Sequence, residues 1–143
     1  MVLVCGPPGA GKTTRAHELA EAEGLVVYDW DDPQWSGEDH FRRGLRALRS
    51  DPGARAVVIR CAATRARRAE AVAMCGATEV EVLVVDPEVC VDRIVKRGRG
   101  DVRKAIRGVR TWFAEEQADR VPYSSSGVPA PVKGRGGVWS RAW

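Results

Sequence analysis

The stretch from residue 2 to residue 15, VLVCGPPGAGKTTR, decides the fold because it joins three kinds of local structure. The apolar run MVLVC at the start of the chain is typical of a buried strand. A loop rich in glycine and proline follows it. The residues from Thr13 to about Glu23 are expected to form a helix that ends at Gly24. A strand, a glycine loop and a helix in direct succession predict the first unit of an α/β fold.

The glycine loop carries a phosphate-binding pattern. Residues 6–13, GPPGAGKT, match G-x-x-x-x-G-K-[ST] in full. In this pattern backbone N–H groups and a helix N-terminus hold phosphates, the lysine bridges the β- and γ-phosphates, and the hydroxyl ligates Mg²⁺. An ordinary turn has no need of Lys followed by Thr, so we expect a nucleoside triphosphate to bind here. The residues expected to contact it are Gly6, Gly9, Ala10, Gly11, Lys12, Thr13 and Thr14, with Thr13 also a ligand of Mg²⁺.

Composition is that of an ordinary globular domain. The chain has 143 residues, of which 44% are hydrophobic and 29% are charged. No apolar run approaches the ~20 residues of a membrane span, and the four cysteines fit neither a zinc pattern nor a disulfide framework. We therefore expect a cytoplasmic protein without a membrane partner. Composition does not predict the oligomeric state.

Charge is unevenly distributed along the chain. The formal net charge is +4, yet residues 1–40 hold only two basic residues against eight acidic ones. Arginine supplies 19 of the 23 basic residues, and its planar fork suits phosphate contacts. Such a bias is equally typical of a GC-rich genome, so charge alone does not indicate nucleic-acid binding.

Apolar segments of strand and helix type alternate as far as residue 120. This alternation predicts an α/β fold of three layers, with a parallel sheet of about four strands, its first strand central, and helices on both faces. Strands are expected at 25–29, 54–62 and 79–86, and further helices at 40–50, 64–74, 87–97 and from Asp101 onward. Residues 1–120 are therefore predicted to form one domain, and 121–143, rich in Pro, Ser and Gly, an irregular tail.

Three carboxylates follow the second predicted strand in the sequence VVYDWDDPQW. Asp29, Asp31 and Asp32 lie within four positions, and one of them can accept a proton from a hydroxyl or hold a magnesium-bound water. Strand alternation predicts Asp29 and Asp31 on the same side. The alternative is a solvated acidic turn, since Asp before Pro is common turn chemistry.

Two tryptophans flank these acids. Trp30 and Trp35 can stack on an acceptor base or, alternatively, cover the open end of the core. We predict that Asp29, Trp30 and Trp35 contact the acceptor. The basic residues of α-helical segments 40–50 and 102–110 form stripes that suit a nucleic-acid backbone, although such stripes are more often solvated helix faces.

The segment DRIVKRGRGDVRK, residues 92–104, predicts a short helical lid. Arginines that are flanked by glycines and lie between two helices can move over a bound triphosphate and neutralise charge in the transition state. Arg93 and Arg97 share one helix face by their spacing, and Arg97 and Arg99 are the residues we expect to act. A solvated helix end, with cations favoured by the dipole, is the alternative.

These features disfavour two other classes of nucleotide-binding protein. No Asn-Lys-x-Asp segment is present to read guanine, which disfavours a GTPase switch. Asp86 ends the fourth predicted strand but also precedes Pro87 at a helix start, so its usual role would be that of a helix cap. Too little chain remains for the lid domain of a motor ATPase.

The loop GPPGAGKTT, the segment DWDD and the segment KRGR together resemble the polynucleotide 5′-hydroxyl kinases of bacteriophages. They are also similar to short phage and actinobacterial proteins described as AAA-family ATPases or predicted kinases. The resemblance covers about residues 1–117. It implies an ATP-binding fold of nucleoside-monophosphate-kinase type, with Lys12 and Thr13 on ATP and Mg²⁺. It further implies Asp31 as general base and metal partner, and Arg97 or Arg99 as the lid arginine.

The resemblance has two departures on the acceptor side. Those kinases place an arginine shortly after the Asp pair, where this chain has Gln34, and end the third strand in an aspartate, where this chain has Cys61. The sequence thus predicts a kinase that transfers the γ-phosphate of ATP to a hydroxyl of a nucleic acid or nucleotide. Single-stranded or 5′-end nucleic acid is the partner this implies. The alternatives are a small-molecule kinase and an ATP-binding switch with slow hydrolysis.

Overall fold

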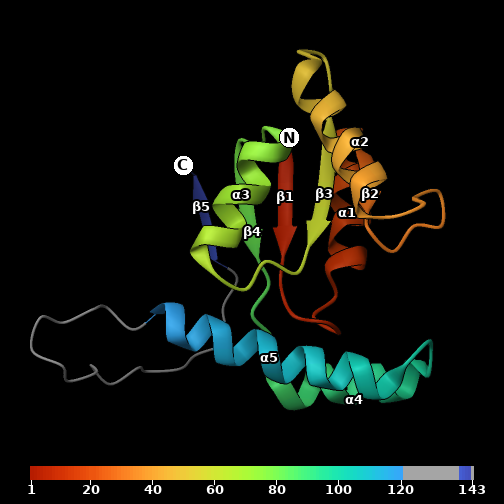
Figure 1. Cartoon of the computed structure of the whole chain (residues 1–143), viewed down its shortest axis with the longest axis vertical. Helices are drawn as coiled ribbons and strands as arrows, with labels where there is room; N and C mark the ends of the chain where they lie inside the picture. The colour runs from red at the N-terminus through yellow and green to blue at the C-terminus, as the bar shows by residue number, and fades with distance from the viewer. Residues whose placement is uncertain (121–138, 143) are drawn as a thin grey trace, which may run out of the picture.

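The computed structural model describes residues 1–120 and 139–142 of the chain. Strands and helices alternate through it as the sequence predicts (Figure 1). The elements in chain order are β1 (Val2–Cys5), α1 (Lys12–Glu23), β2 (Val26–Asp29), α2 (Glu38–Ser50), β3 (Ala56–Arg60), α3 (Arg65–Cys75), β4 (Glu79–Val82), α4 (Pro87–Arg97), α5 (Val102–Arg120) and β5 (Trp139–Ala142).

The sheet has the strand order β2-β3-β1-β4-β5. Its first four strands are parallel, and β1 lies in the centre, with Val4 paired to Ile59 of β3 on one side and to Glu81 of β4 on the other. The predicted parallel sheet of four strands with a central first strand is therefore confirmed. Because parallel strands share one direction, all four end at the same edge of the sheet, where sites of α/β proteins lie.

The structure differs from the predicted irregular tail in one segment, because residues 139–142 form a fifth strand. β5 pairs antiparallel with β4, with Trp139 opposite Val82 and Ala142 opposite Glu79. The four residues WSRA show no alternation of apolar and polar residues, and an edge strand needs only backbone hydrogen bonds on one side. The remainder of the predicted tail, residues 121–138 and 143, lies outside the described residues.

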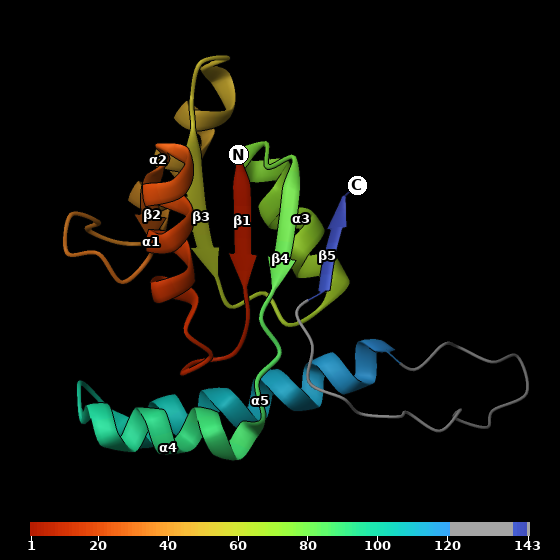
Figure 2. The ribbon, with the colours of Figure 1, turned by 180° about the vertical axis from the view of Figure 1, so that it is seen from behind.

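Helices cover the sheet on both faces and at one end. α2 and α3 lie on one face and α1 on the other, while α4 and α5 lie side by side across the carboxyl ends of the parallel strands (Figures 1 and 2). No helix of the described residues is long and apolar enough to span a bilayer.

Two core clusters follow from the alternation of side chains along the strands. Val2 and Val4 of β1 contribute to the cluster beneath α1, α4 and α5, whereas Leu3 and Cys5 contribute to the cluster beneath α2 and α3. β1 is thus buried on both faces, which explains why its sequence is a continuous apolar run.

β4 is different, because only one of its faces is covered. Val80 and Val82 pack beneath α3, whereas Glu79 and Glu81 lie on the same side as their partners Val2 and Val4. On that side, in the part of the chain that the structure describes, no helix lies over β4 (Figure 2). The alternation of Glu and Val in EVEV matches a strand with one covered face and one uncovered face.

Candidate nucleotide-binding site

The phosphate-binding loop connects β1 to α1 and lies directly against α4. Gly9 has a φ of +79°, and a Cβ placed on it would come within 2.5 Å of the Cys90 carbonyl oxygen. Both the left-handed backbone and the close approach of α4 therefore require glycine at this position. α4 thus closes one side of the loop.

Lys12 and the amino end of α1 face the inside of this loop. α1 begins at Lys12 after Gly11, whose φ is +93°, and no side chain caps its first turn. The N–H groups of that turn thus remain available for an anion. Lys12 Nζ donates a hydrogen bond of 2.8 Å to the Pro7 carbonyl oxygen, which holds the ammonium group within the loop. The arrangement combines backbone donors with one positive charge beside them.

The hydroxyl of Thr13 points toward the end of β2. Thr13 Oγ1 donates to Asp29 Oδ2 at 3.1 Å, while the backbone N–H of Asp31 donates to Asp29 Oδ1 at 3.1 Å. β2 ends at Asp29 and Asp31 lies in the following turn, so the strand alternation expected to place the two carboxylates on one side does not extend to Asp31. Of the three predicted carboxylates, Asp29 is the one in contact with Thr13.

The other acidic residue of this turn has a local role. Asp32 Oδ1 accepts a hydrogen bond of 3.0 Å from the backbone N–H of Gln34, which forms an Asx turn. Asp31 is exposed, and its carboxylate has no hydrogen-bond partner among the described residues. Asp31 is therefore the carboxylate of this turn that remains open to a bound molecule.

The two predicted tryptophans differ in their surroundings. Trp35 donates from Nε1 to the Asp29 carbonyl oxygen at 2.9 Å and packs over Gly44, where a Cβ would lie only 2.8 Å from the indole. Trp30 meets Phe41 edge-on, with 5.5 Å between ring centroids, and keeps 37% of its surface exposed. Trp35 is thus a support for the backbone at Asp29, whereas Trp30 offers a free ring surface.

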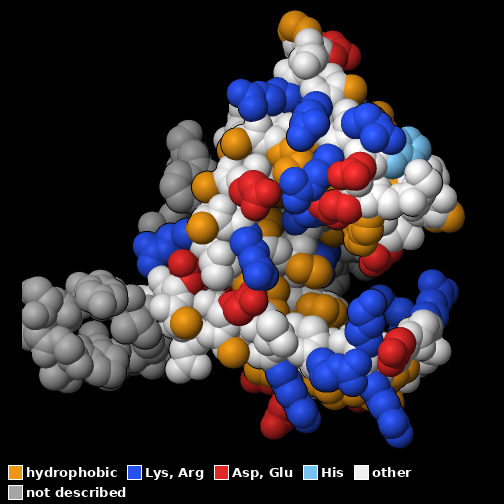
Figure 3. Space-filling view, in the orientation of Figure 1, with side chains coloured by type: hydrophobic (Ala, Val, Ile, Leu, Met, Phe, Trp, Pro, Cys, Tyr) orange, Lys and Arg blue, Asp and Glu red, His pale blue; other side chains and the backbone are white. Residues whose placement is uncertain are grey.

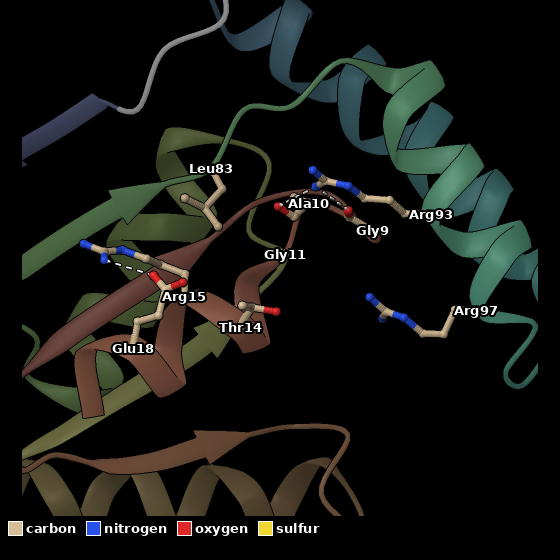
Figure 4. A pocket seen from close by; sticks show the side chains of 9 residues that line it. All are labelled: Gly9, Ala10, Gly11, Thr14, Arg15, Glu18, Leu83, Arg93 and Arg97. Carbon is tan, nitrogen blue, oxygen red and sulfur yellow. Dashed lines mark hydrogen bonds and ion pairs between the residues drawn. The ribbon is translucent and has the colours of Figure 1, made fainter. Parts of the chain in front are cut away.

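Arg93 and Arg97 of α4 both line the cleft beside the loop. Arg93 Nη1 lies 3.4 Å from the carbonyl oxygens of Gly9 and Ala10, and Arg97 points across the cleft toward Thr14 (Figure 4). Arg99 lies in the exposed connection between α4 and α5 and does not line this cleft. The site prediction omitted Arg93, although its spacing of four residues from Arg97 placed the two side chains on one face.

The cleft has a volume of about 350 Å³ and runs from the loop along α1. Its walls come from the loop, the first turns of α1, the end of β4 and one face of α4 (Figure 4). The lining residues are Gly9, Ala10, Gly11, Thr14, Arg15, Glu18, Leu83, Arg93 and Arg97.

Asp86 is not in this cleft. Its side chain accepts a hydrogen bond of 2.8 Å from the backbone N–H of Glu88, and Pro87 occupies the first turn of α4. Asp86 is thus the N-cap of α4, as its position before Pro87 suggested.

A charged group missed by the sequence analysis lies at the end of β3. Arg60 Nη2 donates to Glu38 Oε1 at 3.1 Å, and its guanidinium lies over the Phe41 ring at 5.3 Å from the centroid. Partial desolvation of Glu38 opposes ionisation, but hydrogen bonds from Arg42 and Arg60 outweigh it and hold the pKa of the Glu38 carboxyl below its ordinary value. The next residue, Cys61, is exposed, and its carbonyl oxygen accepts a hydrogen bond from the Trp112 indole.

Solved structures that superpose on this chain include three kinases. A gluconokinase from Sinorhizobium meliloti superposes with a TM-score of 0.58 at 18% identity, over 80% of this chain and 73% of its own. A sugar kinase from Janibacter sp. gives 0.53 at 23% identity, over 87% and 79%. A shikimate kinase from Acinetobacter baumannii, solved with shikimate, gives 0.52 at 24% identity, over 82% and 75%. The chain therefore has the α/β P-loop fold of such proteins.

No protein-family model and no curated protein sequence matches the chain. The likeness rests on three-dimensional structure, at identities that define a fold and not an activity. The resemblance to polynucleotide kinases stays a prediction.

Proposed function

We propose that the protein is an ATP-dependent kinase that transfers the γ-phosphate to a hydroxyl group of a small molecule. The observation that carries this proposal is the hydrogen bond between Thr13 and Asp29 at the amino end of α1. It brings a hydroxyl and a carboxylate beside the ammonium-bearing loop at the carboxyl edge of the sheet. A fold shared with gluconokinase and shikimate kinase supports the reaction class.

The donor side of the site suits a nucleotide with Mg²⁺. Thr13 and Asp29 offer oxygen atoms of the kind that Mg²⁺ prefers, 3.1 Å apart, so the donor set fits this ion. Bound Mg²⁺ supplies positive charge that neutralises the phosphate oxygens. The backbone N–H groups of the loop and Lys12 hold the β- and γ-phosphates, with Thr14 beside them on the first turn.

The arginines of α4 complete the electrostatics of the donor side. Arg93 already lies against the loop, and Arg97 extends into the same cleft. Both guanidinium groups can stabilise the charge that develops on the transferring phosphoryl group. We therefore assign this role to Arg93 and Arg97. Arg99 would take part only if the connection between α4 and α5 moved toward the cleft.

Asp31 is the proposed general base. The acceptor hydroxyl gives its proton to the Asp31 carboxylate, its oxygen forms a bond to the γ-phosphorus, and the bond from that phosphorus to the β–γ bridging oxygen breaks to release ADP. Asp29 is less suited to this role because both its oxygens already accept hydrogen bonds within the protein. Trp30 remains a proposed acceptor contact through its exposed ring.

A small molecule is favoured over a nucleic acid as acceptor. The first preference drawn from the sequence was a nucleic acid, but the compared structures of shared fold are a sugar kinase, a gluconokinase and a shikimate kinase. The acceptor side also lacks the arginine and aspartate of polynucleotide kinases, with Gln34 and Cys61 at those positions. Its nearby arginine, Arg60, is already paired with Glu38.

A screen with labelled ATP and Mg²⁺ tests the proposal. The panel comprises sugars, sugar acids, shikimate, nucleosides and 5′-hydroxyl oligonucleotides. We expect label in one or more small polyhydroxylated compounds, and loss of transfer in Lys12→Ala. Arg43→Ala, which removes an exposed basic residue of α2 outside the cleft, serves as the matched control and should retain transfer.

Two results would contradict the proposal. Label in the oligonucleotides alone would restore the nucleic-acid acceptor. Label released only as free phosphate, at a rate unaffected by every compound in the panel, would favour an ATP-binding switch. Nucleotide binding measured by calorimetry in parallel separates a wrong acceptor from a wrong donor.

A further inference from the structure

The ends of β2 and β3 border the place where an acceptor would approach the phosphate-binding loop. The nucleotide cleft is bounded by Leu83, just past β4, and by α4, whereas β3 and β2 lie on the other side of β1 in the strand order. Phosphoryl transfer places the attacking and leaving oxygens roughly in line. The acceptor hydroxyl therefore approaches from the side opposite the departing ADP, which is the side of β3 and β2.

Arg60 is the last residue of β3 and lies between the loop and the acidic turn. In the sheet register it pairs with Cys5, which precedes the loop, and its neighbour Ile59 pairs with Asp29. The Arg60 side chain remains 23% exposed, so a bound molecule can reach it. An arginine at this place would bind a carboxylate if its charge were available. The partners of Arg60 thus decide which charge the acceptor can carry.

Glu38, in the first turn of α2, compensates this arginine. Arg60 Nη2 donates to Glu38 Oε1 at 3.1 Å, and Arg42 Nε donates to the same oxygen at 3.0 Å. Arg42 is also paired with Glu70 at 3.6 Å, so two glutamates balance two arginines in this cluster. Partial desolvation opposes ionisation of Glu38, but the hydrogen bonds from both arginines keep the pKa of its carboxyl below its ordinary value. The charge of Arg60 is therefore offset before an acceptor binds.

An acidic and an aromatic side chain lie at the same corner. The Asp31 carboxylate is exposed, and as the proposed general base it acts in its ionised form. The Phe41 ring contacts both the Trp30 ring, at 5.5 Å between centroids, and the Arg60 guanidinium, at 5.3 Å from the centroid. The exposed indole offers an apolar surface for the C–H face of a sugar or polyol, whereas Asp31 repels a second negative charge.

On the basis of the proposed kinase function, we propose that Glu38 is a specificity-determining residue, which compensates Arg60 and thereby restricts the acceptor to neutral polyhydroxylated molecules. A neutral acceptor places its C–H face on Trp30 and its hydroxyl at Asp31. The carboxylate of a hydroxy acid in the same place is repelled by Asp31, and Arg60 is not available to offset the repulsion.

Transfer of label from ATP to matched pairs of acceptors tests this inference. The two members of a pair share a carbon skeleton and differ by one negative charge. The pairs are D-sorbitol with D-gluconate, D-galactose with D-galacturonate, and methyl shikimate with shikimate. In each pair that wild-type protein phosphorylates, kcat/KM should be at least ~10-fold higher for the neutral member, which is the scale of like-charge repulsion at a few Å near a protein surface.

Glu38→Gln should weaken or invert this preference. Glutamine keeps the shape of the side chain but removes its charge, so Arg60 becomes available to a carboxylate. The ratio of kcat/KM for the acid to kcat/KM for the neutral member should rise about 10-fold or more, while KM for ATP stays unchanged. Adding Arg60→Ala to Glu38→Gln should return this ratio to the wild-type value, which a general change in packing would not do.

Glu70→Gln is the matched control. It removes the same charge from the same cluster, but Glu70 is paired with Arg42 and not with Arg60, so the ratio of acid to neutral acceptor should stay at the wild-type value. Both glutamate side chains reach solvent, and ion pairs of this kind contribute little to stability. Neither variant should unfold the protein, which thermal denaturation checks.

The outcomes separate this inference from the proposed function. If wild-type protein shows no preference or prefers the acids, or if Glu38→Gln leaves the ratio unchanged, control of acceptor charge by Glu38 is wrong while the kinase function stands. If no member of any pair takes up label, the proposed small-molecule kinase function and this inference both fail, and calorimetry with ATP shows whether the phosphate-binding loop still binds nucleotide.

Discussion

The Thr13 hydroxyl donates a hydrogen bond of 3.1 Å to Oδ2 of Asp29, and this contact joins the start of α1 to the end of β2. The two residues are sixteen positions apart, and in the sheet β3 lies between β2, which ends at Asp29, and β1, which precedes the loop and α1. They meet because α1 begins, and β2 ends, at the same edge of the sheet. Because Asp29 contacts Thr13, we assign Asp29 to the support of Mg²⁺ and Asp31 to the role of general base.

Asp29→Asn and Asp31→Asn should therefore impair different steps. Asp29→Asn removes a charge that supports the metal, so nucleotide binding should require roughly 10–100-fold more Mg²⁺. Asp31→Asn should leave that requirement unchanged and lower phosphoryl transfer by ~10²-fold or more, since it removes the proton acceptor. Calorimetry over a range of Mg²⁺ concentrations and transfer of label from ATP measure the two effects.

Asp32→Asn controls for loss of charge in the same turn. The asparagine oxygen can still accept the hydrogen bond from the Gln34 backbone N–H, so both binding and transfer should stay near wild type. If Asp31→Asn raised the Mg²⁺ requirement and Asp29→Asn did not, Asp31 would be the residue that supports the metal, which contradicts the proposed assignment.

Gly9→Ala should destabilise the protein and abolish nucleotide binding. A left-handed φ costs a residue with a side chain about 1–2 kcal/mol, and overpacking against the Cys90 carbonyl adds typically 1–3 kcal/mol. Urea denaturation measures the change in the free energy of unfolding.

Gly24→Ala separates these two costs. Gly24 ends α1 with a φ of +65°, but a Cβ there would meet nothing within 4 Å. This variant should show the backbone cost alone and bind nucleotide normally. Equal destabilisation of the two variants would mean that the contact between the loop and α4 is not tight.

Arg93→Ala should reduce phosphoryl transfer by ~10²-fold or more, because it removes a positive charge fixed against the loop. Arg97→Ala should have a similar effect, and Arg99→Ala a smaller one, since Arg99 lies outside the cleft. Initial rates at saturating ATP provide the measurement. Arg110→Ala, an exposed arginine of α5, is the control. A larger loss in Arg99→Ala than in Arg93→Ala would show that the connection between α4 and α5 closes over the site.

The order of elements followed from local patterns. Gly6, Gly11, Lys12 and Thr13 identify the loop by spacing alone, and a strand buried on both faces must be apolar throughout, as β1 is. These signals lie within a few residues of each other, so periodicity and motif spacing were sufficient to place the sheet and the phosphate-binding loop.

Features that depend on where an element ends could not be predicted in this way. β2 ends at Asp29, so Asp31, two residues later, lies in a turn to which strand alternation does not apply. Arg93 contacts the loop only because α4 crosses the carboxyl edge of the sheet. Arg60 contacts Glu38 because α2 lies beside the end of β3. Each contact joins residues that are distant in sequence, and no local pattern marks it.

The basic surface raises a separate question about polyanions. Exposed basic side chains gather on the connected ends of α4 and α5, as Figure 3 shows, and include Lys96, Arg97, Arg99, Arg103 and Lys104. This cluster lies beside the mouth of the cleft, where positive potential would attract a triphosphate as well as a nucleic acid. Charge at this place therefore does not choose between the two acceptor classes.

Asp119 should make stability depend on pH in the acid range. The backbone N–H of Arg65 donates to Asp119 Oδ2 at 2.8 Å, and this bond, together with the Arg65 side chain, outweighs partial desolvation and holds the pKa of the Asp119 carboxyl below its ordinary value of 3.8. Asp119 lies near the end of α5, so the bond ties that helix to the start of α3.

Because the native carboxylate takes up a proton less readily than the unfolded one, its contribution is complete above about pH 4–5 and is lost as the pH falls through the lowered pKa. The free energy of unfolding of Asp119→Asn should thus lie below that of wild type at neutral pH and converge with it toward pH 2. Urea denaturation at several pH values measures this, with Glu21→Gln, an exposed carboxylate of α1, expected to follow the wild-type curve. A constant gap between wild type and Asp119→Asn across this range would mean that the loss comes from packing or geometry, and that the charge of Asp119 does not hold α5 to α3.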